Sequence, residues 1–529
     1  MNKNQNNTPS LFSSNTQNEG DSQEDKIESK LHKRQEYFSN EDNFSKIKEN
    51  TMQNELSLGQ NFRNKMFNLK RLKQSMNTEV TQSLKNKLTI SLELYEKCKN
   101  MNVGLSQFSE IITAFRTQDI NKKYFGLVGI RKLLSLNPSP IQELIDVQII
   151  PELIALLDNS PAEFQSEALL CLTNIASGTT DQANRILVKG GLSKILKIMD
   201  SPIEELKIQV SYIIGNLAND SPNIRDALIK EKVFDKLLTI LASTNQTKLI
   251  KQYIWTVSCF FRVKPIPSYD IVQKAIKIIA RAFVMLEKDS EFLTDAVFML
   301  SFITEHYKEA IKDLLELDII KNIIKCLDID IQYIQLSCLR VVGNIASGNA
   351  NQTQSLIDMN ILYYLKKTIY SKAKMIRKES AWIISNIAAG TQRQIESLIS
   401  ENFLPVLEEI IQKDEDEIKK ECIWAVCNLT SVENPIYIKN ILDQNILRII
   451  CNCFKMEDAK YLAVCLEALN NLLLFGKKNC GTGVNPLVVE IEKMGMCDIL
   501  EKLQYHPVDF VYEKVLKLLE TYFEVKYNE

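Results

Sequence analysis

Apolar residues recur every three or four positions along most of this chain, and the two-residue alternation of a surface strand is essentially absent. In "FQSEALLCLTNIAS" (164–177) this spacing predicts one long helix, and the polar stretch "DNSPAE" just before it predicts a turn. A polar break then leads into shorter apolar stretches such as "TQSLIDMNILYYLKKTIY" (353–370). The pattern therefore predicts an all-α protein.

The long helical pattern returns every 42 or 43 residues, with Asn at one position that we call the Asn slot. Lys132 stands in register one step before the first Asn. A helical period near 42 residues is typical of armadillo or HEAT repeats, which bury their apolar faces only by stacking. We expect eight or nine repeats between about residues 105 and 480. The successive Asn slots hold Asn174, Asn216, Cys259, Phe302, Asn344, Asn386, Asn428 and Asn471.

All three tryptophans of the chain, Trp255, Trp382 and Trp424, occupy one other position, four residues before the Asn slot. We call it the Trp slot, and residues four apart share one face of a helix. A single Trp and Asn pair could serve core packing and a helix cap. Because the placement recurs in register, as in "KESAWIISNIAAG" (378–390) and "KKECIWAVCNLTS" (419–431), we favour a binding role.

In armadillo repeats, which this spacing resembles, the longest helix lines the concave face. An Asn amide offers both a donor and an acceptor, so a row of them can hold the backbone of an extended peptide. An indole one turn earlier can stack on the stem of a lysine or arginine, with about 0.5–2 kcal/mol of cation–π attraction. Nearby carboxylates would take the charged tips. The combination predicts a receptor for an extended basic peptide.

Composition changes this picture little. The chain has 529 residues, of which 45% are hydrophobic and 25% charged, and its net charge of −2 favours no nucleic-acid partner. No apolar run reaches the ~18–20 residues of a membrane span, and the polar N-terminus has no signal-peptide pattern, so we expect an intracellular protein.

The chemistry of an enzyme or a metal site has no sequence support. The twelve cysteines lie in apolar stretches without CxxC spacing, and the closest two are Cys451 and Cys453. The three histidines, His32, His306 and His506, are dispersed. Phosphate-binding loops and nucleophile motifs are missing. We expect no catalytic residue, no metal and no cofactor.

The repeats resemble those of the importin alpha family of nuclear import adaptors. The resemblance covers about residues 60–525 and rests on "LTNIASGT", "LRVVGNIASGNANQTQSLID" and "SAWIISNIAAGT", and on the tail "GVNPLVVEIEKMGMCDILEKLQYHPVDFVYEKVLKLLETYF". A generic armadillo protein such as a catenin would not share this rhythm. The resemblance implies an all-α, right-handed superhelical solenoid of about ten armadillo repeats over residues 105–525.

The family binds basic nuclear localisation signals at two sites, and the major site lies in repeats two to four. In this chain the Trp slots there include a Leu and a Tyr, and Cys259 replaces one Asn. In repeat five, Phe298 and Phe302 stand where a Trp and a Tyr are usual. The resemblance assigns to the major site Leu170, Asn174, Gly178, Gln209, Tyr212, Asn216, Asp220, Trp255 and Asp295.

The minor site, in repeats six to eight, is nearly intact, apart from a family acid replaced near Ala350. The lost aromatic walls of the major site would remove about 1–3 kcal/mol of binding free energy, so we expect the minor site to contribute an unusually large share. The resemblance assigns to it Arg340, Asn344, Thr353, Glu379, Trp382, Asn386, Glu421, Trp424 and Asn428.

The N-terminal region divides in two. Residues 1–60 are rich in Asn, Ser, Gln and charge and are expected to be disordered. Residues 61–88, "NFRNKMFNLKRLKQSMNTEVTQSLKNKL", carry one acid, Glu79, and could be a solvated basic linker. The resemblance implies instead an importin-beta-binding segment over 61–90, which occupies the adaptor's own groove when unbound. Its basic residues are Arg63, Lys65, Lys70, Arg71, Lys73, Lys85 and Lys87.

The resemblance further implies three partners, which are cargo with basic signals, an importin-beta carrier, and an export receptor bound by the last repeat. It implies shuttling between cytoplasm and nucleus. An armadillo scaffold for a non-basic peptide and nucleic-acid binding through 61–88 are the rival interpretations. The acids Asp220, Glu379 and Glu421 favour basic peptides and would repel phosphate.

Overall fold

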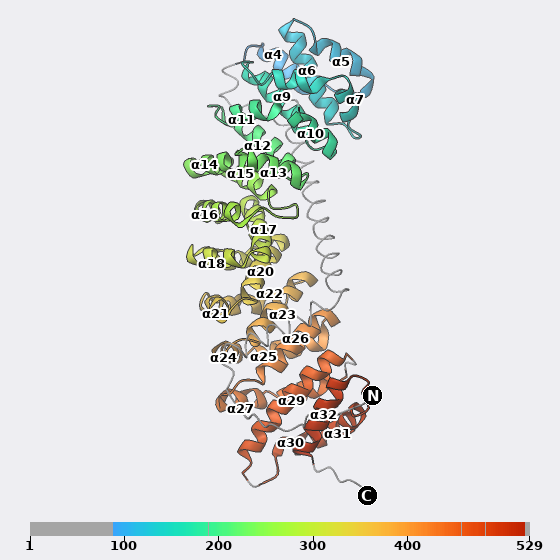
Figure 1. Ribbon diagram of the computed structural model, residues 1–529, viewed down its shortest axis with the longest axis vertical. Helices are drawn as coiled ribbons and strands as arrows, with labels where there is room; N and C mark the ends of the chain where they lie inside the picture. Colours follow the sequence, from blue (N-terminus) through green and yellow to red (C-terminus); the bar gives the residue numbers. More distant parts are fainter. Residues whose placement is uncertain (1–87, 189, 456–457, 482, 524–529) are drawn as a thin grey trace, which may run out of the picture. The chain divides into compact units, whose positions relative to one another are not determined.

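The computed structural model describes residues 88–523 except 189, 456–457 and 482 (Figure 1). These residues form helices and no strand, which confirms the all-α prediction. The region 1–60 and the basic residues of 61–87 lie outside the described residues.

One helix of each repeat carries the Asn slot or its equivalent, and we call it the ladder helix. From α9 to α29 these helices begin in the same steps of 42 or 43 residues that separate the Asn slots, so the predicted repeat is confirmed. The ladder helices are α6 (Ile120–Leu134), α9 (Ala162–Ile175), α12 (Glu204–Ala218), α15 (Thr247–Cys259), α17 (Ser290–His306), α20 (Gln332–Ala346), α23 (Lys374–Ala388), α26 (Asp416–Leu429), α29 (Ala459–Asn479) and α32 (Asp509–Tyr522).

The remaining helices precede or connect the ladder helices. They are α4 (Leu92–Asn100), η1 (Leu105–Gln107), α5 (Phe108–Phe115), α7 (Ile141–Asp146), α8 (Ile149–Ala155), α10 (Thr180–Val188), α11 (Gly191–Ile198), α13 (Pro222–Lys230), α14 (Val233–Ser243), α16 (Tyr269–Leu286), α18 (Lys308–Glu316), α19 (Ile319–Lys325), η2 (Cys326–Asp328), α21 (Ala350–Asp358), α22 (Ile361–Thr368), α24 (Gln392–Ser400), α25 (Phe403–Lys413), α27 (Pro435–Asp443), α28 (Ile446–Cys453), α30 (Pro486–Lys493) and α31 (Met496–Leu503).

A single residue with positive φ joins the two connecting helices in most repeats. This left-handed conformation costs little for Gly and is tolerated by Asn and Asp, which explains most of the residues found there. The turn lets the second helix fold back on the first at the same place in successive repeats. Its residues are Gln148, Gly190, Lys232, Asp318, Asn360, Asn402, Asn445 and Gly495.

The ladder helices are amphipathic in register. The residue two positions before the Asn slot is fully buried in every repeat, whereas the Asn side chains are mostly half-buried. A helix that buries one stripe against its neighbours leaves the adjoining stripe for other contacts. The buried positions are Leu172, Ile214, Val257, Leu300, Val342, Ile384, Val426 and Leu469.

The described residues form two compact units. The larger unit comprises residues 88–384 and 409–422, and the smaller comprises 385–408 and 423–523. In the larger unit, ladder helices α6, α9, α12, α15, α17 and α20 each pack against the next, and Figure 1 shows these repeats following one another in chain order. In the smaller unit, α29 packs against α28, α30 and α32.

Helix α4 covers the first ladder helix and extends the packed structure upstream of residue 105. Ile90, Tyr95 and Cys98 are buried. The Thr89 backbone N–H and hydroxyl donate to Glu163 Oε1 at 2.7 and 2.6 Å. Residues 88–101 therefore belong to the folded part of the chain.

By length and composition alone, α29 could cross a membrane, and no other helix in the described ranges meets that criterion. Half of its most apolar stretch is buried inside the structure. Because α29 packs against three helices of its own unit, burial of its apolar face in a core accounts equally well for its composition.

Candidate functional site

Two Asn-slot side chains, Asn216 and Asn344, are tied to the preceding repeat. Asn216 Nδ2 donates to the Thr173 carbonyl at 3.1 Å, and Asn344 Nδ2 donates to the Ser301 carbonyl at 3.3 Å and to Thr304 Oγ1 at 3.0 Å. These bonds fix the orientation of each amide and link successive ladder helices. An Asn amide has two N–H donors and a carbonyl acceptor, so such a bond does not exhaust it. The spacing of the Asn residues alone did not predict this structural role.

Two of the three tryptophans, Trp255 and Trp382, lie on glycines of the preceding repeat. A Cβ added to Gly215 would lie 2.6 Å from Cη2 of Trp255, and one added to Gly343 would lie 2.8 Å from Cε3 of Trp382. Both indoles therefore lie directly on a helix backbone. Each glycine immediately precedes an Asn slot, and that signal was present in "IIGNLAND" and "VVGNIASG".

The aromatic wall extends across neighbouring repeats within each unit. In the larger unit, the Tyr212 and Trp255 rings lie 5.6 Å apart between centroids at 56°. In the smaller unit, Trp424 and Tyr461 lie 6.2 Å apart, edge to face. Tyr212, Trp255 and Trp424 are half-buried. Aromatic rings arranged in this way can pack against the aliphatic stem or the cationic head group of a lysine or arginine.

Three predicted site residues hold buried polar atoms that have no hydrogen-bond partner in the part of the chain that the structure describes. These atoms are Asp220 Oδ2, Gln209 Oε1 and Asn386 Nδ2. The other end of the Gln209 amide donates to Ser166 Oγ at 2.7 Å. A buried polar atom without a partner costs about 1–3 kcal/mol, so each of these positions favours a ligand that supplies one.

The remaining predicted residues of repeats two to six lie on or beside the ladder helices. Leu170 is buried, and Asn174 and Gly178 are half-buried. A Cβ at Gly178 would clash with Oε1 of Gln182, which caps α10. Thr353 is buried and its hydroxyl donates to the Ala346 and Asn349 carbonyls at 3.3 and 3.2 Å, so it secures the end of α20.

Acids stand three residues before the Trp slot in several repeats. Glu379 lies 3.6 Å from Arg340 Nε, and Asp295 lies 3.4 Å from an Arg262 terminal nitrogen. Glu421 is buried. These acids were predicted to bind a ligand, whereas arginines of the chain itself pair with two of them.

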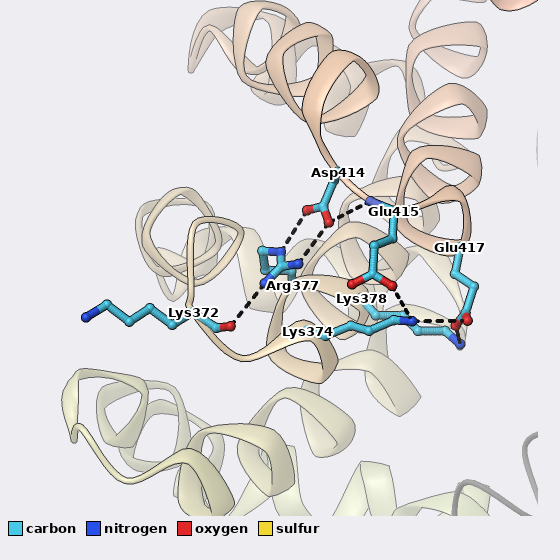
Figure 2. A network of polar contacts seen from close by, with 7 residues as sticks. All are labelled: Lys372, Lys374, Arg377, Lys378, Asp414, Glu415 and Glu417. Atoms are coloured by element: carbon cyan, nitrogen blue, oxygen red, sulfur yellow. Dashed lines mark hydrogen bonds and ion pairs between the residues drawn. The ribbon is translucent and has the colours of Figure 1, made fainter.

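A network of charges fixes the start of α23, the helix that carries Glu379 and Trp382 (Figure 2). The Arg377 guanidinium binds both Asp414 oxygens, with Nε–Oδ2 and Nη2–Oδ1 distances of 2.7 and 2.9 Å. This hydrogen bonding holds the pKa of Asp414 below its ordinary value. The flanking ion pairs are Lys374–Glu415 at 2.6 Å, Lys374–Glu417 at 3.3 Å and Lys378–Glu417 at 2.7 Å.

The described residues contain no cluster of His, Cys, Asp or Glu that could hold a metal ion. Burial raises the pKa of Cys422 and other thiols, which keeps them protonated.

Comparisons with known proteins agree with the repeat architecture. A family model for the armadillo/beta-catenin-like repeat matches residues 137–177 and 391–431, and one for an atypical Arm repeat matches 485–529. A model of the SIL1/FES1/HPBP1 C-terminal domain matches 182–318. An engineered protein of known crystal structure superposes with a TM-score of 0.64 at 22% identity, covering 79% of this chain and 98% of its own. That likeness concerns the fold alone.

Curated relatives share more of the sequence. Importin subunit alpha-1b of Oryza sativa subsp. japonica is 34% identical over 418 residues, covering 78% of each chain. Importin subunit alpha-B of Dictyostelium discoideum is 37% identical over 430 residues, covering 80% of this chain and 83% of its own. Importin subunit alpha-3 of Arabidopsis thaliana is 33% identical over 423 residues, covering 78% of each chain.

Proposed function

Because the chain belongs to the importin alpha family of nuclear import adaptors, we propose that it binds basic nuclear localisation signals and links their cargo to an importin-beta carrier. The ladder helices provide the binding surface in this proposal. The adaptor would shuttle between cytoplasm and nucleus, and an export receptor would return it.

The observation that carries the proposal is the carboxylate of Asp220. It lies at the end of α12, one helical turn beyond Asn216, and its Oδ2 atom is buried without a hydrogen-bond partner among residues 88–523 as described. A carboxylate with one oxygen buried in this way is stabilised by a cation that brings its own hydrogen-bond donors. A lysine or arginine side chain of the bound peptide supplies both.

The rest of the proposed major site grips the peptide by other means. The amides of Asn174 and Asn216 would hold its backbone, and Gln209 would accept a further N–H at its buried Oε1 atom. Tyr212 and Trp255 would flank the stems of the basic side chains. Leu170 offers an apolar contact in place of a third aromatic wall, and Gly178 leaves room at the α9–α10 turn.

A second region in repeats six to eight would bind a second basic cluster. Asn344 and Asn386 act as backbone clamps, Trp382 acts as a wall, and Glu379 takes the charge. The Nδ2 atom of Asn386 is buried and lacks a hydrogen-bond partner in the described ranges, which suits a peptide carbonyl. Arg340, Thr353, Glu421, Trp424 and Asn428 complete the proposed minor site.

The basic segment that ends near residue 90 would be the part that the carrier binds. The segment has seven basic residues, from Arg63 to Lys87, and only one acidic residue, so a carrier with an acidic surface would attract it. When no cargo is bound, the same charges would compete for Asp220 and Glu379. This competition would let cargo release the segment for the carrier.

Fluorescence polarisation with the full chain tests the proposal. A labelled peptide with two lysine- and arginine-rich clusters should bind, and a version with the basic residues changed to alanine should not. Asp220→Asn should weaken binding at least tenfold, since a charge-assisted hydrogen bond is worth about 1.5–3 kcal/mol. Asp443→Asn, on an exposed position of α27, is the matched control and should change nothing. Equal binding of the basic and alanine peptides would refute the proposal.

A further inference from the structure

Arg262 follows α15, and its guanidinium lies among three groups of the larger unit. One terminal nitrogen donates to Ser258 Oγ at 2.6 Å and lies 3.4 Å from Asp295 Oδ1. The guanidinium carbon lies 5.8 Å from the centroid of the Phe298 ring. Only 12% of the Arg262 side chain and 17% of the Asp295 side chain are exposed. The cation is therefore largely enclosed.

The loop that begins at Arg262 is anchored from both sides. Arg225 of α13 is 1% exposed, and its Nη1 atom donates to the carbonyls of Val263 at 2.6 Å and Pro265 at 2.5 Å. On the other side, the Tyr307 hydroxyl donates to the Pro267 carbonyl at 2.7 Å. The backbone that carries Arg262 is thus held in place, so moving its side chain means breaking the contacts described above.

The environment of Arg262 has the composition of a cation-binding position in this fold. Asp295 and Phe298 stand three residues apart on α17, with the acid before the Trp slot. Glu379 and Trp382 have the same spacing on α23. An acid next to an aromatic face attracts a guanidinium or ammonium group by charge and by cation–π interaction. An arginine of the chain, Arg340, lies 3.6 Å from Glu379, and in repeat five Arg262 meets both the acid and the aromatic ring.

We propose, on the basis of the proposed function, that Arg262 is a built-in occupant of the Asp295–Phe298 position and excludes a basic peptide side chain from it. A lysine brought to this position would meet a cation a few ångströms away in a partly enclosed environment, where like charges repel strongly. Displacing Arg262 would break its bonds to Ser258 and Asp295. Repeat five then selects against Lys and Arg at the facing peptide residue, and Asp295 acts by positioning Arg262.

A lysine scan of the peptide tests this inference with the full chain. A single lysine is moved, one residue at a time, along the neutral stretch between two fixed basic clusters. With the natural chain, no position of the scan should change the dissociation constant more than twofold. With Arg262→Gln, which leaves Asp295 without that cation, one position should tighten binding at least fivefold.

Three further variants control the result. Arg262→Lys keeps the positive charge and should behave like the natural chain. The double variant Arg262→Gln with Asp295→Asn removes both charges and should lose the gain. Arg262→Ala also removes the positive charge, should tighten binding at the same scan position, and serves if Arg262→Gln does not fold.

The outcomes separate this inference from the proposed function. If the natural chain binds basic peptides but neither Arg262→Gln nor Arg262→Ala gains affinity at any position, the inference is wrong and the proposed function stands. If only Arg262→Gln binds basic peptides, the inference holds and the proposed function fails. If neither protein binds them, both are wrong.

Discussion

The indole of Trp382 lies against the backbone of Gly343, the residue just before Asn344 on the preceding ladder helix. Trp255 and Gly215 repeat this relationship. The glycine therefore lets an aromatic wall of one repeat stand next to the Asn of the repeat before it. A wall and a backbone clamp that bind one peptide have to be neighbours in this way.

Replacing Gly343 by Ala should disturb that arrangement. Alanine gains about 1 kcal/mol of helix propensity, but overpacking costs about 1–3 kcal/mol, and the new Cβ would clash with Cζ3 of the Trp382 ring. We expect a net loss of about 0–2 kcal/mol in the free energy of unfolding, measured by urea titration, and weaker binding of a basic peptide. Gly104→Ala, whose nearest neighbour would be 3.9 Å away, is the control and should do neither. A Gly343→Ala protein that is more stable and binds normally would contradict this account of the wall.

The pair of Arg377 and Asp414 predicts a pH dependence of stability. The bond from Arg377 lowers the pKa of Asp414 below 3.8, so the pair stabilises the fold above that pH and loses its effect as the pH falls through the lowered pKa. Asp414→Asn should therefore lower the free energy of unfolding at pH 7 by about 1–3 kcal/mol, measured by urea titration. The difference in free energy between this variant and the natural chain should shrink below about pH 3.8.

The control for this measurement is Asp498→Asn, an exposed acid for which a constant and small difference is expected across the same pH range. A difference between Asp414→Asn and the natural chain that stays the same from pH 7 to pH 3 would show that the pair does not titrate as described.

The sequence predicted the repeat well because its signal is long. Seven consecutive steps of 42 or 43 residues cannot be mistaken, and the ladder helices begin at the same intervals. The start of the folded region was harder to predict from the sequence. Helix α4 precedes the expected start at 105, and its buried residues, Tyr95 and Cys98, belong to no repeat pattern.

The candidate site was predicted by residue type but not by bonding. The sequence marked Asn344 as a peptide clamp, whereas its bond to the preceding helix depends on stacking geometry that one helix does not encode. The sequence could not predict the partner of Asp295 either, because Arg262 approaches it from an anchored loop after α15. The glycines below Trp255 and Trp382 recur in the repeat pattern, so the sequence alone could have predicted them.

Removing residues 1–87 should tighten the binding of a basic peptide, if the basic segment competes for the same acids. The truncation keeps Thr89 and Ile90, because Thr89 bonds to Glu163 and Ile90 is buried. Isothermal titration of the full and truncated chains with one peptide measures the effect. A control variant of the full chain, with Lys70, Arg71 and Lys73 changed to alanine, should reproduce part of the gain. Equal affinities of the full and truncated chains would argue against self-inhibition.

The central claim is that the ladder helices bind basic peptides, with the region around Trp382 and Trp424 contributing an unusually large share. The most direct measurement is the affinity for one peptide with two basic clusters. It compares the double variant that carries both Trp382→Ala and Trp424→Ala with the single variant Asp220→Lys. We expect both proteins to bind more weakly than the natural chain, and the tryptophan double variant to lose at least as much as Asp220→Lys. If only Asp220→Lys weakens binding, the claim is wrong.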